Sequence, residues 1–397
     1  MTHLGNCLRQ ALAATLTITV LAGASAPAYA QDINMEGVGK DRVLLGTSTP
    51  LTGPVGPPCK PVSDGSLAWF QHINDQGGIK GRKVDNTVMD DAYKAPEALA
   101  NGRQLAAKPV FAFFAGCGTL QPPVLMPIAK QNNMLYLFPS AGNPELMTTP
   151  FVYSLWPLYS DQFGGLVSTT LGKYGAGTVF SILPDVPGIE ETITRIKEGI
   201  TAGKGKYLGE ERITQREADY TPLVLKIKAL KPDYLIVHTT APATAKIVNA
   251  LQAQDAMPPK YLLGAATMAS PAFLTAGGTL INNKALVVIP VVPADDARAK
   301  TCLDVMKKYT PDTPVDSFSL YGCAIAQVFT AILADTPEPL TRASFEKTMM
   351  SWKGKKATEL MQPITFNNPQ HLGAGEMTLG KIVNGKVVAD GTVVLPK

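Results

Sequence analysis

Short hydrophobic runs alternate with segments of helical periodicity along most of the chain. Runs typical of strands occupy residues 43–46, 83–89, 111–115, 135–137, 178–183, 234–238, 261–263 and 285–293. Apolar positions recur at helical spacing over 64–74, 96–107 and 120–132. Alternation of strands and helices favours parallel sheets covered by helices, so we expect an α/β fold. So many strands exceed what one doubly wound sheet usually holds, which favours two lobes.

The C-terminal segment has a different pattern. Residues 364–366, 377–383 and 386–394 have the composition of strands, and Asn384-Gly385 separates the last two. Asn-Gly is the dipeptide that best fits a two-residue hairpin turn. We therefore predict that a β-hairpin ends the chain.

The first thirty residues have the pattern of a targeting segment. Arg9 is their only charged residue, an apolar run covers 12–22, and Ala28-Tyr29-Ala30 has the A-x-A form of a cleavage site. The apolar run is shorter than the roughly 20 residues that cross a bilayer as a helix, and no later stretch reaches that length. We predict a cleaved secretory signal over residues 1–30 and a mature chain from about Gln31. The alternative is an uncleaved anchor.

Composition and charge narrow the classes of function. The chain carries 36 Lys+Arg and 32 Asp+Glu, for a net charge of +4, and 45% of its residues are hydrophobic. This apolar content is that of a folded protein rather than a disordered one. Because the chain has no basic run, its charge gives no signature of nucleic-acid binding.

Four cysteines remain if the signal is cleaved. They are Cys59, Cys117, Cys302 and Cys323. An even number in an exported protein permits two disulfides, with three possible connectivities. Pairing of sequence neighbours would give Cys59–Cys117 and Cys302–Cys323. Since no spacing is CxxC, neither a redox motif nor a zinc site is indicated.

The sequence lacks the common motifs of catalysis and metal binding. His72, His238 and His371 lie far apart without a second ligand at metal spacing, so we predict no metal. Neither a G-x-S-x-G elbow nor a G-x-G-x-x-G after the first strand occurs. The adjacent carboxylates Asp90 and Asp91 would point to opposite faces of a strand, which does not indicate a shared acid–base site. These observations favour a binding protein without a cofactor over an enzyme.

A series of short segments, in a fixed order, carries a resemblance to a known family. The segments are Leu51-Thr52-Gly53-Pro54, 74–84, Asp90-Asp91, 127–129, 139–146, Lys231-Pro232-Asp233 and 319–322. They resemble the periplasmic leucine/isoleucine/valine-binding proteins, which are the solute-binding components of ABC importers. The matching region extends over about residues 43–394, nearly the whole mature chain.

The resemblance implies a type I periplasmic binding fold. Two Rossmann-like lobes with parallel sheets would be joined by a three-strand hinge and would close on a solute in the cleft between them. The crossovers are expected near 154–157, 289–293 and 360–364. The first lobe would comprise 32–155 plus 290–360, and the second 156–289 plus 361–397. The resemblance also implies a periplasmic monomer that binds a small molecule and contacts ABC permease subunits at the inner membrane.

Ligands of α/β sheets sit beyond the carboxyl ends of the strands. With the resemblance, this rule selects Pro58, Cys59, Cys117, Gly118, Thr119, Ser140, Ala141 and Gly142 in the first lobe, and Tyr159, Asp185, Thr239 and Thr240 in the second. Alternatives stay open for four residues. Thr119 and Asp185 could instead cap the helices that follow them. Trp156 and Tyr321 could face the cleft or only the core.

Two positions depart from the family pattern. In amino-acid-binding relatives, a hydroxyl residue in the 139–146 segment helps to hold the α-carboxylate, and Gly142 stands there in this chain. A glutamate that holds the α-ammonium corresponds to Ala243. Because an ammonium without a counter-charge is costly in a closed cleft, we expect a small organic acid or aromatic compound. Backbone amides, Ser140 and Thr119 would hold its carboxylate.

The cysteines also depart from the family pattern. Cys117 matches a half-cystine of the family, but the usual partner position corresponds to Tyr93. Cys59 on the adjacent loop replaces that partner in our interpretation, and two free thiols are the alternative.

Two other classes of function stay open. A ligand sensor would use the same fold to signal to a regulator or receptor. An enzyme would need a nucleophile–base pair, which the sequence does not offer.

Overall fold

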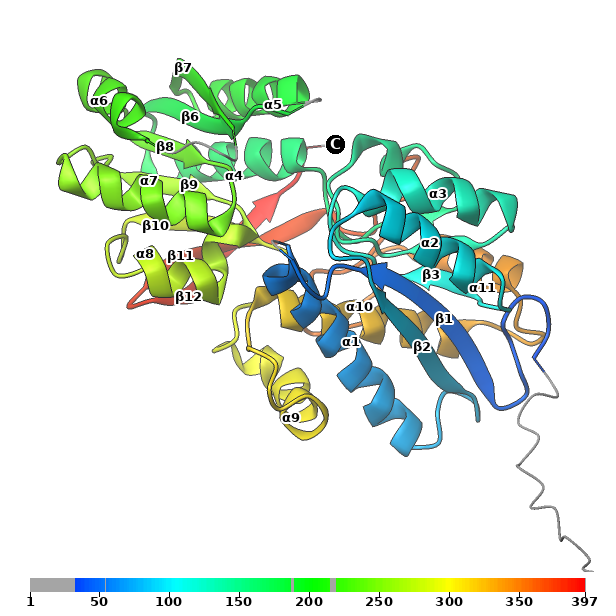
Figure 1. The fold of residues 1–397 in the computed structure, drawn as a ribbon. Helices are drawn as coiled ribbons and strands as arrows, with labels where there is room; N and C mark the ends of the chain where they lie inside the picture. The colour runs from blue at the N-terminus through cyan, green and yellow to red at the C-terminus, as the bar shows by residue number, and fades with distance from the viewer. Residues whose placement is uncertain (1–32, 54, 187–188, 215–218, 397) are drawn as a thin grey trace, which may run out of the picture. The chain divides into compact units, whose positions relative to one another are not determined.

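The computed structural model describes residues 33–396, except 54, 187–188 and 215–218. The predicted signal over residues 1–30 lies outside the described residues. The described chain contains one five-stranded and one seven-stranded sheet, each covered by helices (Figure 1). This arrangement is the two-lobed α/β fold that the sequence predicted.

The first sheet has the strand order β2-β1-β3-β4-β5, and all its pairings are parallel. Its strands are β1 (Arg42–Thr49), β2 (Lys83–Asp90), β3 (Ala112–Phe114), β4 (Leu135–Leu137) and β5 (Val152–Tyr153). Helices α1 (Gly56–Asp75) and α10 (Ser317–Asp335) pack together on one face, and α2 (Ala95–Ala106) and α3 (Gln121–Gln131) on the other. In a parallel sheet the carboxyl ends of all strands share one edge, so the loops that follow them come together there.

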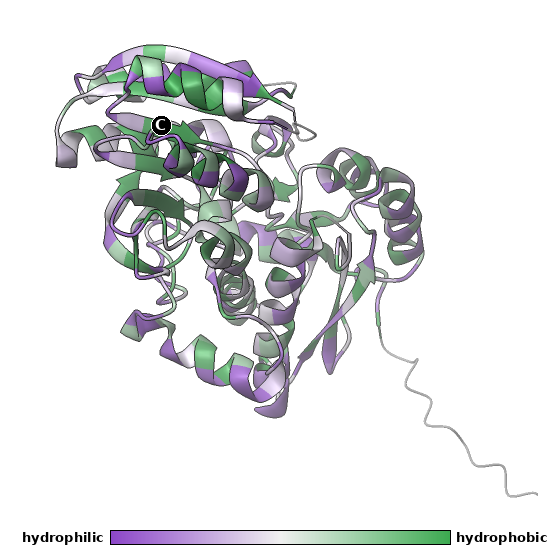
Figure 2. Cartoon of the chain, turned by 60° about the vertical axis from the view of Figure 1, so that its left-hand side comes forward, coloured by the Kyte–Doolittle hydropathy of each residue, from purple (hydrophilic) through white to green (hydrophobic). Residues whose placement is uncertain are grey.

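Alternation along the strands explains the two faces. Phe114 packs against Phe70 of α1 and Phe329 of α10, whereas the preceding residue, Phe113, packs on the opposite face with Tyr136. Successive side chains of a strand point to opposite faces, so each short apolar run supplies both layers of core. Figure 2 shows hydrophobic and hydrophilic residues interspersed along the covering helices, with hydrophobic colours on part of the strands.

The second sheet has the order β12-β11-β10-β9-β8-β6-β7. Its parallel strands are β6 (Thr178–Pro184), β7 (Lys206–Ile213), β8 (Tyr234–Val237), β9 (Tyr261–Gly264) and β10 (Ala285–Ile289). Strands β11 (Glu376–Val383) and β12 (Lys386–Val394) are antiparallel additions at one edge. Helices α4 (Tyr159–Tyr174) and α5 (Ile189–Ala202) cover one face, and α6 (Thr221–Leu230), α7 (Ala241–Ala253) and α8 (Pro271–Gly277) the other.

The remaining elements are short or lie near α10. They are the 3₁₀ turns η1 (Pro144–Met147), η2 (Ala266–Ala269) and η3 (Ala297–Ala299), and helices α9 (Lys300–Tyr309) and α11 (Arg342–Met350).

The predicted terminal hairpin is confirmed. β11 and β12 pair across Asn384 and Gly385, whose φ angles are 50° and 71°. Positive φ at both central residues is what a type I′ turn requires. The register shifts between Leu379 and Gly380, which marks a bulge.

Three local predictions were wrong. Residues 364–366 do not form a strand, because Phe366 instead stacks on Phe138 in the core. Helix α1 begins at Gly56 rather than Asp64, since prolines are tolerated in the first turn of a helix. The third wrong prediction was that no stretch after the predicted signal is long and apolar enough to cross a membrane. Helix α10 has that length and apolarity, but 83% of its most apolar window is buried, as in a core helix.

Residues 364–372 pack against the first sheet, although the expected boundaries place them in the second lobe. Besides the Phe366–Phe138 contact, His371 stacks on Tyr153 of β5 with ring centroids 4.8 Å apart. Leu372 forms a β-bridge with Ser154, just after β5. By these contacts, the chain stays with the first sheet until shortly before β11.

Candidate functional site

The loops after β3 and β4 are joined beyond the carboxyl ends of these strands. Cys117 and Ser140 form a parallel β-bridge. The Ser140 N–H donates to the Gly116 carbonyl at 2.7 Å, and the Gly118 N–H donates to the Ser140 carbonyl at 3.1 Å. These backbone hydrogen bonds hold the loops after β3 and β4 together, and the two loops form one wall of the predicted site.

Two disulfides tie helices to this region and to α10. Cys59 in α1 is bonded to Cys117, with 5.4 Å between their Cα atoms. Cys302 in α9 is bonded to Cys323 in α10. The first disulfide therefore connects the start of α1 with the loop after β3.

The adjacent carboxylates at the end of β2 hold neighbouring loops. Asp90 accepts hydrogen bonds from the Leu51 N–H at 2.8 Å and the Thr52 hydroxyl at 2.6 Å. Burial opposes its ionisation, but these bonds and one from the Ala92 N–H outweigh burial and lower the pKa of Asp90 to about 2. Asp90 thus fixes the loop between β1 and α1.

Asp91 holds a different loop. It is buried and accepts hydrogen bonds at 2.9 Å from Ser48 and from Gln121 at the start of α3. Burial raises the pKa of Asp91, and these hydrogen bonds only partly offset that rise. The two carboxylates serve separate loops, which agrees with the absence of a shared acid–base site.

We expect Asp90→Ala to loosen the β1–α1 loop in a pH-dependent way. The folded-state pKa of Asp90 lies below its ordinary value of 3.8. Its contribution to stability is therefore present above pH 3.8 and is lost as the pH falls through about 2. Urea unfolding of both proteins at several pH values measures this. The stability advantage of the wild type should shrink with acid, and an advantage that persists unchanged at pH 2 would contradict the assignment.

A cavity of about 620 Å³ lies where residues of the two lobes meet. The first lobe contributes the β1–α1 loop, the first two turns of α1 and the segment before α10, and the second lobe contributes the starts of α7 and α8. The lining residues are Leu51, Thr52, Gly53, Val55, Gly56, Pro57, Pro58, Lys60, Pro61, Asp64, Thr240, Ala241, Pro242, Thr267, Ser270, Pro271, Ala272, Asp312, Pro314, Asp316 and Phe318. We call this space the interlobe cavity.

Prolines at the helix starts make the interlobe cavity poor in hydrogen-bond donors. Pro57 and Pro58 occupy the first turn of α1, and Pro242 and Pro271 occupy the first turns of α7 and α8. Proline has no N–H, so these helix starts offer fewer free donors than usual. The Gly56 N–H is already bonded to the Gly53 carbonyl at 3.2 Å. The cavity therefore suits a solute with an apolar body.

Of the predicted site residues, Pro58 and Thr240 line the interlobe cavity. Cys59 and Cys117 are buried in their disulfide, behind this wall. The Thr119 hydroxyl lies 3.1 Å from the Tyr93 hydroxyl. The N-cap of α3 is Leu120, so the alternative of Thr119 as a helix cap is wrong.

The other predicted residues of the first lobe are covered by aromatic rings. A Cβ at Gly142 would lie 2.6 Å from the Tyr159 ring, and a Cβ at Gly118 would lie 2.8 Å from the Tyr93 ring. Gly142 thus lets Tyr159 of α4 pack directly on the loop after β4. Ser140 and Ala141 are buried beside it.

The predicted residues of the second lobe divide into a group that is at least half-buried and an exposed one. Burial raises the pKa of Tyr159 to about 12, and its ring lies 4.8 Å from that of His238. Burial lowers the pKa of His238 to about 4, which keeps its imidazole neutral. Thr239 is buried next to it. Asp185 is exposed after β6, and the lining of the interlobe cavity does not include it.

Buried polar atoms gather between the loop after β4 and α10. The Trp156 Nε1 is buried and forms no hydrogen bond within the described residues, and the buried Ser140 and Tyr321 hydroxyls face each other without a further protein partner there. The Trp156 ring stacks on Phe318 at 6.1 Å and meets Tyr321 edge-on at 5.1 Å. Phe318 lines the interlobe cavity, so this polar cluster lies directly behind the cavity wall.

Sequence reasoning missed Asp316 and Phe318 as cavity residues. Asp316 caps α10 with a capping box that includes Ser319. The sequence signal at Asp316 is that of a helix start, and a capping pattern does not say which cavity the helix start faces. Burial raises the pKa of Asp316 to about 6.

Two α/β lobes with a cavity at their junction are the arrangement of a solute-binding protein. Within the described residues, no group of His, Cys, Asp and Glu is arranged to hold a metal ion. The periplasmic binding protein family matches residues 43–386, and the chain belongs to this family. Members of the family are substrate-binding proteins, not enzymes.

Individual relatives are distant but extend over nearly the whole chain. The Leu/Ile/Val-binding protein homolog 3 of Brucella melitensis is 21% identical over 367 residues, covering 92% of this chain and 98% of the relative. The substrate-binding protein LivJ of Streptococcus pneumoniae, solved with isoleucine, has a TM-score of 0.75 at 17% identity and covers 89% of this chain and 100% of its own. A solute-binding protein of R. palustris, solved with benzoate, has a TM-score of 0.72 at 16% identity, with coverages of 89% and 97%. At these identities, the structural likenesses establish the fold alone.

Proposed function

We propose that this protein is the periplasmic solute-binding component of an ABC importer. It would capture a small organic acid, aromatic compound or amino-acid-like solute and deliver it to permease subunits at the inner membrane. The observation that carries the proposal is the interlobe cavity, which takes its walls from both lobes. Closure of the lobes around a solute would bury it and change the surface available to a permease. We further propose that the protein acts as a monomer after export.

The wall after β3 and β4 supports binding of a polar solute group. The buried Trp156 Nε1 has an unused donor, and the buried Ser140 and Tyr321 hydroxyls lie next to each other. Each buried donor without a partner is costly, so a ligand oxygen that reaches them would be favoured. We propose that a carboxylate or carbonyl of the solute binds here, after Tyr159 moves from its position over Gly142.

We propose the lobe boundaries expected from the sequence, with one adjustment. The first lobe comprises residues 32–155 and 290–372, and the second lobe 156–289 and the chain from 373 onward, including the C-terminal hairpin. The contacts of Phe366 with Phe138 and of Leu372 with Ser154 support a third crossover after residue 372 rather than at 360–364.

A thermal-shift panel tests the proposed function. The panel contains leucine, isoleucine, valine, phenylalanine, benzoate and short aliphatic carboxylates. A solute that binds only the folded state stabilises it by about 2.7 kcal/mol at a hundredfold excess over its Kd. We expect at least one solute class to raise the midpoint of thermal unfolding. The same solutes should change the fluorescence emission of Trp156, and the Trp156→Phe variant should lose this change in emission. If turnover of a bound compound accompanied binding, the protein would not be a transport component alone.

A further inference from the structure

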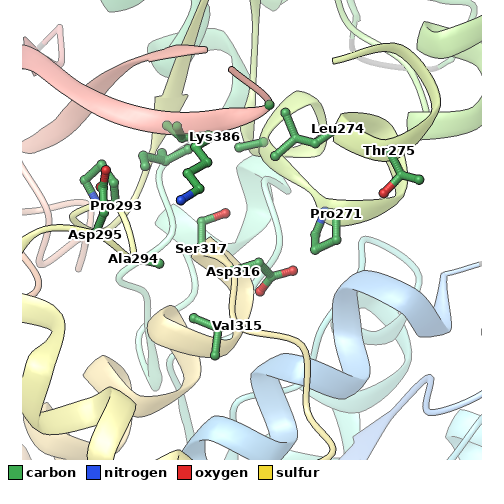
Figure 3. A pocket seen from close by; sticks show the side chains of 14 residues that line it. Pro271, Leu274, Thr275, Pro293, Ala294, Asp295, Val315, Asp316, Ser317 and Lys386 are labelled. Carbon is green, nitrogen blue, oxygen red and sulfur yellow. The ribbon is translucent and has the colours of Figure 1, made fainter. Parts of the chain in front are cut away.

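Asp316 lies between two cavities. A second cavity of about 500 Å³ is lined by α8, the chain after β10, the start of α10 and the turn between β11 and β12 (Figure 3). It shares Pro271 and Asp316 with the interlobe cavity, so the two spaces are adjacent. Figure 3 shows Ser317 and Lys386 facing this second space beside Asp316.

The carboxylate of Asp316 is buried without a protein cation. Asp316 is 7% exposed, and its Oδ1 accepts the N–H groups of Phe318 and Ser319 at 2.9 and 2.8 Å. Within the described residues, hydrogen bonds and burial, but no charged side chain, account for its pKa. A buried carboxylate without a counter-charge is costly, and a ligand cation would remove that cost.

A second polar group beside Asp316 also lacks a partner. Ser317 is 8% exposed, and its hydroxyl forms no hydrogen bond within the described residues. Its side chain lines the second cavity (Figure 3). A carboxylate and a free hydroxyl on adjacent residues provide acceptors for the N–H groups of an ammonium.

The charges around both cavities favour a cation. Their lining includes four carboxylates, of Asp64, Asp295, Asp312 and Asp316, and two ammonium groups, of Lys60 and Lys386. Lys60 is already paired with Asp64 at 2.5 Å. An excess of negative charge in a concave, partly apolar space attracts a positively charged group.

We propose that Asp316 binds a cationic group of the solute, and that the solute is a small amine with an apolar body. This inference rests on the proposed function and narrows its solute class. In the sequence comparison, Ala243 replaces the family glutamate that holds the α-ammonium, so no counter-charge for an ammonium was predicted. The structure supplies a carboxylate from a different element, the start of α10. The proline-lined helix starts and Phe318 would contact the apolar body.

Two matched series of compounds test this proposal by isothermal titration calorimetry of the wild-type protein. One series is leucine, 3-methylbutylamine and 4-methylpentanoate, and the other is phenylalanine, 2-phenylethylamine and 3-phenylpropanoate. Within each series the apolar body is kept while the ammonium or the carboxylate is removed. We expect the amine-bearing members of at least one series to bind, and the carboxylate without an amine to bind more weakly.

Asp316→Asn isolates the charge. Asparagine caps helices as well as aspartate does, so the variant should keep the start of α10 and unfold close to the wild-type midpoint. We expect it to weaken binding of the amines about tenfold or more, the usual effect of losing a charged hydrogen-bond partner. The control is Asp304→Asn, an exposed carboxylate of α9 that lines neither cavity, which should change affinity by less than about threefold because distant exposed charges are screened.

A pH series adds an independent measurement. Amine affinity of the wild type should fall as the pH drops through about 6, where the Asp316 carboxylate gains a proton in the free protein. The other charged groups that face this region are Lys60, Asp64, Asp295, Asp312 and Lys386. Asp316→Asn separates their titration from that of Asp316, because the fall near pH 6 should disappear in the variant.

Several results would overturn the proposal. They are binding of no amine by the wild type, tighter binding of the carboxylates than of the amines, or unchanged amine affinity in Asp316→Asn. The proposed function fails only if, in addition, neither the carboxylates nor the amino acids bind the protein or shift its unfolding midpoint.

Discussion

Replacing Gly322 with alanine is expected to lower the free energy of unfolding by about 3 kcal/mol, the upper range for overpacking a core. Gly322 lies in α10 at its crossing with α1, and a Cβ there would lie 2.0 Å from the Val62 carbonyl oxygen. Gly65 has the reciprocal position in α1, where a Cβ would lie 2.1 Å from the Ser319 carbonyl oxygen. Both obstacles are backbone atoms, so a side-chain rotation cannot relieve them. The two helices must separate instead.

Separation of α1 from α10 would also disturb the interlobe cavity, because the starts of both helices line it. We therefore expect Gly322→Ala to reduce the ligand-induced thermal shift as well as stability. Urea unfolding measures the loss of stability. Calorimetry with the bound solute measures the effect on solute binding. The matched control is Gly172→Ala in α4, where a Cβ meets nothing within 4 Å. Alanine should stabilise that helix slightly. An unfolding midpoint of Gly322→Ala equal to that of the wild type would contradict the close crossing.

Removing the Cys59–Cys117 disulfide by a double serine substitution is expected to lower stability by about 4 kcal/mol. The disulfide closes a loop with a sequence separation of 58, and the entropy of that loop in the unfolded chain sets the magnitude. It also connects the start of α1, at the cavity, with the loop that bears Gly118. We therefore expect weaker solute binding even at temperatures where the variant is fully folded.

The second disulfide serves as the control. Cys302–Cys323 has a sequence separation of 21, so its removal should lower stability by about 3 kcal/mol on the same argument. It joins α9 to α10, and neither cysteine lines the interlobe cavity. Solute affinity should therefore stay near the wild-type value. Equal losses of affinity in the two variants would show that the Cys59–Cys117 bond has no special effect on the site.

Local signals in the sequence were sufficient for most of the fold. Apolar runs such as 234–237 became central strands because every side chain in them is buried on one face or the other. Asn384-Gly385 fixed the last turn by its backbone preference alone. The predictions failed where tertiary contacts decided the outcome. Residues 364–366 were predicted as a strand, but Phe366 stacks on Phe138, which is far away in the sequence. The polar edge strand β7 has too little apolar alternation to be recognised.

The sequence by itself determined the α/β alternation, the terminal hairpin and the family, because these depend on short-range periodicity and on the order of short motifs. Only the tertiary structure decided which residues meet at the cavity. Pro58 and Thr240 were predicted there and line it, whereas Gly142 lies beneath Tyr159 and Asp185 is exposed. Asp316 carries the sequence signal of a helix cap, and its place between two cavities follows from the packing of α10 against α1 and from the approach of α8. Such a position is a sum of long-range contacts, and no local pattern records it.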